Sequence, residues 1–233
     1  MNLHNGFLIV ASLSPEYAKT ASFAAASIKE YYPDAHITLF VSKQIEQYID
    51  RSVFDLIISD GVPNHRRAKL HSLSRTPYSN LTVYVDADME CMHKDIQTIW
   101  DNVPPDADIT LTKIRPYNGK IAVWANGKLT HHCGFFVYKN EKRVLDFMDV
   151  WWEDYAKQVS LPWPYEDHPR ELAPWDQFTF WKLLNVDKMD INVQFFEDDA
   201  RWNFVNGYKI TETNNPIIFY HHTVPSKQDQ TYS

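Results

Sequence analysis

The first half of the chain repeats one pattern, in which a short and almost uninterrupted apolar run is followed by a helix-length or turn segment. The runs are GFLIVASLS at 6–14, HITLFVS at 36–42, FDLIISD at 54–60 and LTVYV at 81–85. A strand with no polar face must be covered on both sides, and this happens mainly in parallel sheets flanked by helices. The pattern therefore predicts an α/β fold with a largely parallel sheet.

Two helices are expected between these strands. Ser14 followed by Pro15 is typical of an N-cap with proline at the first helical position, so the first helix should run from there to about Tyr31. The basic segment 66–76 is the second expected helix. It should end before Pro77, because the residue that precedes a proline disfavours the helical conformation.

The second half of the chain has shorter and more scattered apolar runs. We expect strands at 108–114, 131–139, 191–197 and 216–222, and helices at 141–158 and 173–184. The segment 160–174 carries four prolines and is expected to form a loop on the side of the functional site. No linker composition interrupts the chain, so a single domain, 1–233, is predicted.

Charge and cysteine content narrow the class of protein. The formal net charge of −7 argues against binding nucleic acid mainly through phosphate neutralisation. Two cysteines, Cys91 and Cys133, are too few for a disulfide framework and favour a reducing, cytoplasmic location. The opening segment does not resemble a signal peptide, and no run approaches the roughly 20 apolar residues of a membrane span.

The tripeptide Asp-Ala-Asp occurs twice, at 86–88 and at 106–108. The first copy directly follows the strand at 81–85, and ligands of open parallel sheets bind beyond the carboxyl ends of the strands. Residues two apart in extended chain point to the same side, so Asp86 and Asp88 are expected to converge. The second copy precedes a strand and is expected at the opposite edge of the sheet, in a turn or strand-entry role.

Asp86 and Asp88 are candidate ligands for a divalent cation. A hard cation prefers oxygen ligands and keeps positions open for water and substrate phosphates, which a close carboxylate pair at a strand end allows. The pair therefore suits Mg²⁺ or Mn²⁺. The alternative for an isolated Asp-x-Asp is a surface turn with two solvated aspartates.

Five segments together resemble a known enzyme family, in the correct order along the chain. RRAKLHSLSRTPYSNLTVYVDADMEC at 66–91 resembles the nucleotide-binding core of the GT-A glycosyltransferase fold, with a basic helix, a strand and a metal-binding Asp-x-Asp. SPEYAKTASFAAASIK at 14–29 resembles the first helix of the glycogenin-like family 8 transferases. HHCGFFVYKN at 131–140 resembles their Asn-Ser-Gly strand, and WDQFTFWKLL at 175–184 their Asp-Gln helix. YHHTVPSK at 220–227 resembles their closing segment.

The resemblance implies a Rossmann-like GT-A fold, with a mostly parallel central sheet flanked by helices and a small mixed second sheet. It implies that 1–100 form the nucleotide-binding half and 101–233 the donor-sugar and acceptor half. Departures from the family pattern occur at His132 and Cys133, where the family usually has Asn-Ser, and at Val224, which replaces a glycine. The chain is thus similar to the family as a distant relative, and the donor sugar stays open.

The resemblance also implies roles for individual residues. Asp88 and His221 would bind the metal directly, and Asp86 would share the metal and contact the ribose. Lys69 and Lys227 would neutralise phosphates, and a metal site with imidazole and carboxylates favours Mn²⁺, with Mg²⁺ as the alternative. The residues implied to contact the nucleotide-sugar are Ser12, Tyr17, Arg66, Lys69, Asp86, Ala87, Gly134, Gln177 and Lys227. Asp176 and Lys227 are the implied catalytic residues.

Several of these residues have an ordinary structural alternative. His221 and the neighbouring His222 can be strand-end histidines, and which of the two would bind the metal is open. Tyr17 can be a core side chain, and Asp176 can be a helix cap. Arg66, Arg67, Lys69 and Arg75 can form the solvated face of a helix.

The tryptophans are divided by position. Trp151 and Trp152 lie on an expected helix and are predicted to be core residues, whereas Trp163 and Trp175 lie beside prolines and are candidates for stacking on an acceptor.

The implied function is metal-dependent transfer of a sugar from a nucleotide-diphosphate donor, a UDP-sugar by the resemblance, to a hydroxyl acceptor with retention. A glycan, lipid-linked sugar, protein, metabolite or modified DNA base can be the acceptor. The alternatives are a carbohydrate-binding protein without catalysis and a sugar-1-phosphate nucleotidyltransferase. The latter needs a glycine-rich phosphate loop after the first strand, and ASLSPEYAKT has none. The oligomeric state is open.

Overall fold

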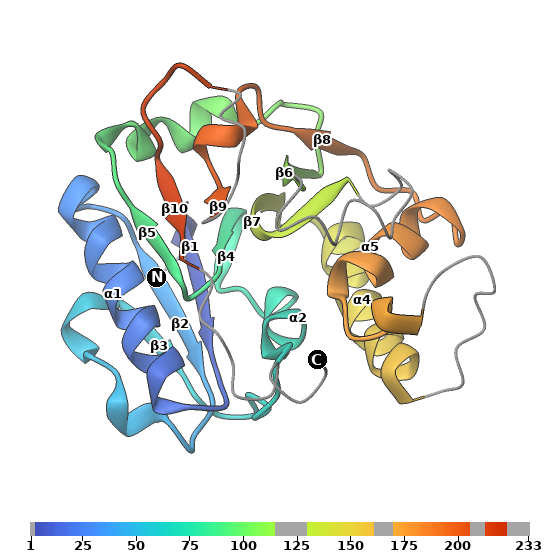
Figure 1. Ribbon diagram of the computed structural model, residues 1–233, viewed down its shortest axis with the longest axis horizontal. Coiled ribbons are helices and arrows are strands. Elements are labelled where there is room, and N and C mark those ends of the chain that lie inside the picture. Colours follow the sequence, from blue (N-terminus) through green and yellow to red (C-terminus); the bar gives the residue numbers. More distant parts are fainter. Residues whose placement is uncertain (1–2, 115–129, 161–169, 206–212, 223–233) are drawn as a thin grey trace.

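The computed structural model describes residues 3–114, 130–160, 170–205 and 213–222. A seven-stranded sheet forms its centre, in the order β3-β2-β1-β4-β7-β6-β8 (Figure 1). These strands are β1 (Leu3–Ala11), β2 (Ile37–Val41), β3 (Leu56–Ile58), β4 (Tyr78–Val85), β6 (Ile109–Lys113), β7 (His131–Lys139) and β8 (Val193–Phe195).

Most strand pairs in this sheet are parallel. Strands β3, β2, β1 and β4 pair in parallel, as do β6 and β8, whereas β7 runs antiparallel to both of its neighbours, β4 and β6. The predicted α/β class with a largely parallel sheet is confirmed.

The apolar strands are explained by burial on both faces of the sheet. Phe7 and Ile9 of β1 lie in one core cluster, and the alternate residues Leu8 and Val10 lie in the other. Helix α1 (Pro15–Tyr31) packs in the first cluster, and α2 (Ala68–Leu73), α4 (Lys142–Ser160) and α5 (Asp176–Asn185) contribute to the second. Figure 1 shows α1 well separated from α4 and α5.

A second, three-stranded sheet lies beside the central one, in the order β5-β10-β9. Strand β10 (Phe219–His221) is antiparallel to β5 (Met89–Cys91) and parallel to β9 (Phe204–Val205). The small mixed sheet is thus confirmed. Strands β5 and β9 were not predicted, because segments of two or three residues are too short to show a periodic pattern. Short 3-10 helices are η1 (Glu46–Tyr48), η2 (Arg51–Val53), η3 (Lys94–Asn102), η4 (Arg170–Leu172) and η5 (Asp199–Arg201).

Element ends differ from the predictions where turns intervene. Strand β1 ends at Ala11 rather than reaching residue 14. Ser14 occupies the N-cap of α1 as predicted, but its side chain makes no capping hydrogen bond. Helix α2 is shorter than the predicted 66–76, and α5 begins at Asp176 rather than at 173.

The second Asp-Ala-Asp lies before β6, and its contacts connect segments of the fold, as predicted from its position before a strand. The side chain of Asp108 is fully buried, where it forms an ion pair with Arg143 and accepts a hydrogen bond from the backbone N–H of Asn192 at 2.8 Å. These contacts tie the start of β6 to the start of α4.

Several other expectations can be placed in the fold. Trp151 is fully buried and Trp152 is partly buried against the same cluster, which agrees with their predicted core role. Cys91 and Cys133 are both buried free thiols. Among the described residues, no helix combines the length and the apolar character that crossing a membrane requires.

Candidate active site

A tight turn at the end of β4 presents Asp86 and Asp88. The backbone N–H of Met89 donates to the carbonyl oxygen of Asp86 at 3.2 Å, and the N–H of Asp86 donates to the carbonyl oxygen of Gly134 on β7 at 2.8 Å. Carboxylate oxygens of Asp86 and Asp88 lie within 4.8 Å of each other, which confirms the predicted convergence, but a turn rather than an extended strand produces it.

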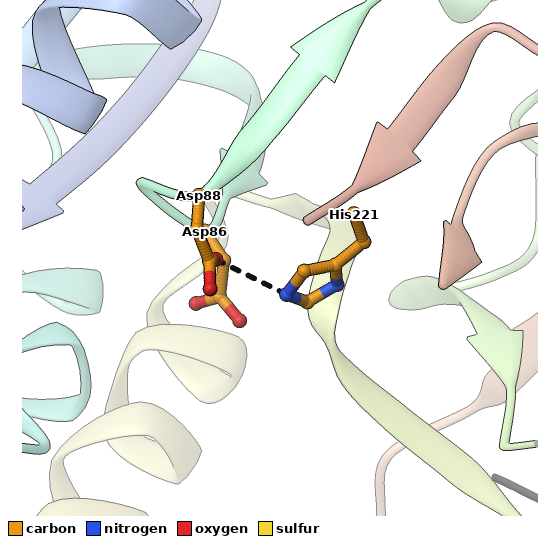
Figure 2. Close-up of side chains that lie close together, drawn as sticks. All are labelled: Asp86, Asp88 and His221. Carbon is orange, nitrogen blue, oxygen red and sulfur yellow. Dashed lines mark ion pairs between the residues drawn. The ribbon is translucent and has the colours of Figure 1, made fainter. Parts of the chain in front are cut away.

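Strand β10 brings His221 to this turn. In the antiparallel ladder His221 lies opposite Met89, and the N–H of His222 donates to the carbonyl oxygen of Asp88 at 2.9 Å. His221 Nε2 lies 3.1 Å from Asp88 Oδ1, and one ligand atom from each of Asp86, Asp88 and His221 lies within 4.8 Å of the others. Figure 2 shows the three side chains pointing toward one another.

The neighbouring histidine points elsewhere. His222 Nε2 lies 2.6 Å from Glu90 Oε2, and its side chain is 45% exposed. Adjacent residues of a strand face opposite sides, so of these two histidines His221 is the one that faces Asp86 and Asp88. A set of two carboxylates and one imidazole fits a Mn²⁺-type cation, and compact oxygen ligands also accept Mg²⁺.

Asp86 is held by a buried hydroxyl and a buried cation. Tyr84 donates its hydroxyl to Asp86 Oδ1 at 2.5 Å, and Lys69 Nζ lies 3.4 Å from the same oxygen. Burial raises the pKa of Asp86 and the nearby Asp88 adds to this, while Lys69 opposes it. Burial acts to lower the pKa of His221, but Asp88 outweighs it and raises the pKa above the ordinary value.

Lys69 joins this carboxylate cluster to Asp176 at the start of α5. Its ammonium lies 2.9 Å from Asp176 Oδ2 and donates to the carbonyl oxygen of Cys133 at 2.8 Å. Arg67 Nε lies 3.0 Å from the other carboxylate oxygen, Asp176 Oδ1. Burial acts to raise the pKa of Asp176, but Arg67 and Lys69 outweigh it and lower the pKa. Asp176 is therefore an ionised, buried partner of two cations and not a helix cap.

Gly134 allows the site to close. A Cβ atom at this position would lie 2.8 Å from Asp86 Oδ2, 2.8 Å from His132 Cε1 and 2.9 Å from His221 Cε1. Real Cβ atoms essentially never approach other heavy atoms this closely, so any side chain here would displace a candidate ligand. The predicted close approach at Gly134 is therefore to side chains of the candidate cation site.

The Gly134→Ala variant is expected to weaken Mn²⁺ binding about tenfold or more, because the methyl group pushes Asp86 and His221 apart. Titration calorimetry with Mn²⁺ measures this. Gly61→Ala is the matched control. Gly61 has a φ of +73°, which an alanine adopts only with strain, but a Cβ atom there would meet nothing within 4 Å. That control should lose about 1–2 kcal/mol of stability and keep its Mn²⁺ affinity. Affinity within twofold of wild type for Gly134→Ala would exclude the steric argument.

The turn between β1 and α1, which follows Ser12, contains an unusual backbone conformation at Leu13. Ser14 N–H donates to the carbonyl oxygen of Ser12 at 3.0 Å around Leu13, whose φ of +75° lies in a region that leucine rarely adopts. Leu13 N–H donates to Asn64 Oδ1 at 2.7 Å, and Ser12 Oγ donates to the carbonyl oxygen of His65 at 2.7 Å. Strained backbone of this kind is often found at functional sites.

The other implied residues lie in varied environments. Tyr17 in the first turn of α1 and Arg66 before α2 are partly buried, and the Ala87 side chain is buried in the core beneath the turn. Gln177 follows Asp176, and its buried Oε1 has no hydrogen-bond partner within the described part of the chain. Lys227 lies outside the described residues, as does Trp163.

The structure adds residues that the sequence analysis did not assign to the site. The sequence pattern indicates only a solvated helix face for Arg67 and only a strand for Tyr84. Asn203 and His132 contact the site through hydrogen bonds that come from distant segments. For His132, the departure from the family pattern was a sequence signal that could have pointed to the site. The sequence around Asn203 contains no such signal.

Comparisons with known proteins bear on the fold of this chain. No family model and no curated protein matches the chain. The galactosyltransferase LgtC, solved with donor and acceptor sugar analogues, is 16% identical over 94% of this chain and 87% of its own, with a TM-score of 0.58. The glycosyltransferase GlyE of Streptococcus pneumoniae is 13% identical over 96% of this chain and 55% of its own, with a TM-score of 0.64.

A eukaryotic structure matches along its whole length. Mouse xyloside xylosyltransferase 1 is 12% identical, and the match covers 97% of this chain and all of that one, with a TM-score of 0.55. The strand order, the small mixed sheet and these neighbours lead to one conclusion. The chain has the GT-A fold of nucleotide-sugar glycosyltransferases.

Proposed function

We propose that this protein is a metal-dependent glycosyltransferase that moves a sugar from a nucleotide-diphosphate donor to a hydroxyl acceptor. The observation that carries the proposal is the convergence of Asp86, Asp88 and His221 at the carboxyl end of β4, beside the buried Lys69–Asp176 pair. In sheets of this kind ligands bind beyond the carboxyl ends of the strands. The likeness to solved glycosyltransferases supports the same reaction class.

The chemistry requires charge stabilisation at the leaving phosphates. Breaking the bond between sugar and diphosphate builds negative charge on the nucleotide, and a bound Mn²⁺ or Mg²⁺ supplies Lewis-acid stabilisation there. Asp86, Asp88 and His221 would hold this cation. Lys227 follows His221 by six residues, and we assign it, with Lys69, to neutralising phosphate charge.

Asp176 would position the donor sugar rather than act as a base. Its lowered pKa, caused by Arg67 and Lys69 against the effect of burial, makes its carboxylate a weak proton acceptor. An inverting transferase needs a general base of suitable pKa for the acceptor hydroxyl. The environment of Asp176 therefore disfavours Asp176 as that base. We infer retention from the family resemblance, and NMR analysis of the product anomer tests it. The adjacent Gln177, whose amide oxygen has no hydrogen-bond partner among the described residues, would contact the same sugar.

The two alternatives account for fewer of these contacts. A nucleotidyltransferase would hold phosphates in a glycine-rich loop after β1, but residues 12–14 are Ser-Leu-Ser and their backbone N–H at Leu13 is already bonded to Asn64. A carbohydrate-binding protein without catalysis would not need carboxylates and an imidazole converging beside a buried ammonium. The UDP moiety, the hydroxyl acceptor, a single-domain organisation and a cytoplasmic location remain parts of our proposal.

Calorimetric titration of UDP and GDP, each with Mn²⁺, with Mg²⁺ and with chelator, tests the function. We expect one nucleotide to bind in the presence of metal and to lose at least about tenfold in affinity with chelator, because its diphosphate completes the cation's coordination. Absence of metal-dependent binding for both nucleotides would contradict the proposal and favour the carbohydrate-binding alternative.

A further inference from the structure

A chain of hydrogen bonds behind the cation site begins at a backbone group whose role is unambiguous. The N–H of Gly134 donates to Nδ1 of His132 at 3.1 Å. A backbone amide nitrogen can only donate, so Nδ1 of His132 is the acceptor, and the proton of this neutral imidazole lies on Nε2. Burial, together with the nearby His221 and Lys69, lowers the pKa of His132 to about 3, which agrees with a neutral ring.

The same imidazole nitrogen fixes the orientation of the Asn203 amide. Asn203 is fully buried, and its Nδ2 lies 2.8 Å from His132 Nδ1 and 3.0 Å from Thr112 Oγ1. Because His132 Nδ1 is an acceptor, the amide group that faces it must be the NH₂ group, which has one hydrogen for His132 and one for Thr112. The register of the sheet places Thr112 opposite His132, so the two acceptors are held side by side.

The other end of the amide then determines the tautomer of His221. Asn203 Oδ1 lies 3.1 Å from His221 Nδ1, and an amide oxygen can only accept. His221 Nδ1 therefore carries a proton, and in the neutral ring Nε2 keeps a free lone pair. That nitrogen is the one that lies 3.1 Å from Asp88 Oδ1, in the cation site.

From this geometry we propose that Asn203 is a positioning residue that sets two neighbouring histidines in opposite tautomers. His221 is kept as a ligand through Nε2, and His132, whose Nε2 carries hydrogen, is kept as a donor that cannot bind the cation. The inference rests on the proposed cation at Asp86, Asp88 and His221. Groups behind a metal ligand commonly change metal affinity about 10- to 100-fold when they are removed.

Mn²⁺ titration of three variants gives the first test. Asn203→Ala should bind Mn²⁺ about 10- to 100-fold more weakly than wild type. Thr112→Val keeps the shape of the side chain and removes one acceptor of the amide, so its affinity should fall about fivefold. Thr110→Val is the matched control on the same strand, because Thr110 is equally buried and its hydroxyl has no partner within the described residues. Its affinity should equal that of wild type.

Nitrogen-15 NMR of the imidazoles gives a second test that needs neither metal nor activity. At a pH at which both rings are neutral, we expect His221 protonated on Nδ1 and His132 protonated on Nε2. In folded Asn203→Ala, the Nε2-protonated form should appear for His221. Wild-type His221 protonated on Nε2, or Mn²⁺ affinity within twofold of wild type for both Asn203→Ala and Thr112→Val, would overturn the proposal.

The two tests separate the inference from the function on which it rests. If wild type binds no Mn²⁺ but shows the opposite tautomers, the metal assignment fails and the role of Asn203 in setting tautomers stands. If wild type binds Mn²⁺ and the two histidines share one tautomer, the function stands and the role of Asn203 fails.

Discussion

The Asp88→Asn variant is expected to lower sugar-transfer turnover about 100- to 1000-fold, because under the proposed function it removes a charged ligand from the cation that would stabilise the leaving diphosphate. The amide keeps the shape of the side chain, so the fold should be retained. It also removes the carboxylate that lies 3.1 Å from His221 Nε2, and the affinity for Mn²⁺ should fall with the turnover. Release of nucleoside diphosphate from the donor sugar measures the effect.

The second Asp-Ala-Asp supplies the matched control for this prediction. Asp106→Asn makes the same change of charge at an exposed residue of the second copy. Asp106 precedes β6, whereas Asp88 follows β4, and both strands run antiparallel to β7, so the two residues lie at opposite ends of the strands. Its turnover should equal that of wild type. Turnover of Asp88→Asn within tenfold of the Asp106→Asn value would show that Asp88 is not a ligand of a cation used in the reaction.

The Asp176→Asn variant is expected to lose about 3–5 kcal/mol of unfolding free energy, because it removes the carboxylate that pairs with the buried cations of both Arg67 and Lys69. The Asp176 side chain is 1% exposed and that of Lys69 is 7% exposed, so water cannot replace the lost carboxylate. Urea unfolding measures the difference. Asp149→Asn is the control, since Asp149 pairs with Arg75 at 3.6 Å and both side chains are about half exposed. That surface pair should contribute less than about 1 kcal/mol.

The difference in unfolding free energy between wild type and Asp176→Asn should depend on pH in a defined direction. Arg67 and Lys69 outweigh burial and lower the pKa of Asp176 in the folded state. Its contribution to stability is therefore complete above the unfolded value of about 4 and is lost as the pH falls through the lower folded-state pKa. The difference between wild type and Asp176→Asn should be constant from about pH 5 to 8 and should shrink below about pH 4. A difference that grows on acidification would contradict the ion-pair account.

The sequence was most informative where a local pattern reports burial. The apolar runs of β1, β2 and β4 predicted a parallel sheet, because only burial on both faces removes the polar alternation. The position of Asp86 and Asp88 directly after β4 predicted that their carboxylates converge at this edge of the sheet. Patterns failed for β5 and β9, which are too short to be periodic, and for Arg67, whose charge suggested a solvated helix face but whose guanidinium pairs with Asp176.

The sequence by itself determined the α/β class, the edge of the sheet that carries the candidate site and the carboxylate pair, because each depends on residues close together in the chain. Only the tertiary structure decided that His221 rather than His222 faces the carboxylates, since that follows from the register of β10 against β5. It also decided that Asn203 links His132 to His221. Hydrogen-bond partners separated by 18 and 71 positions leave no trace in a single sequence, because their meeting depends on how the whole chain packs.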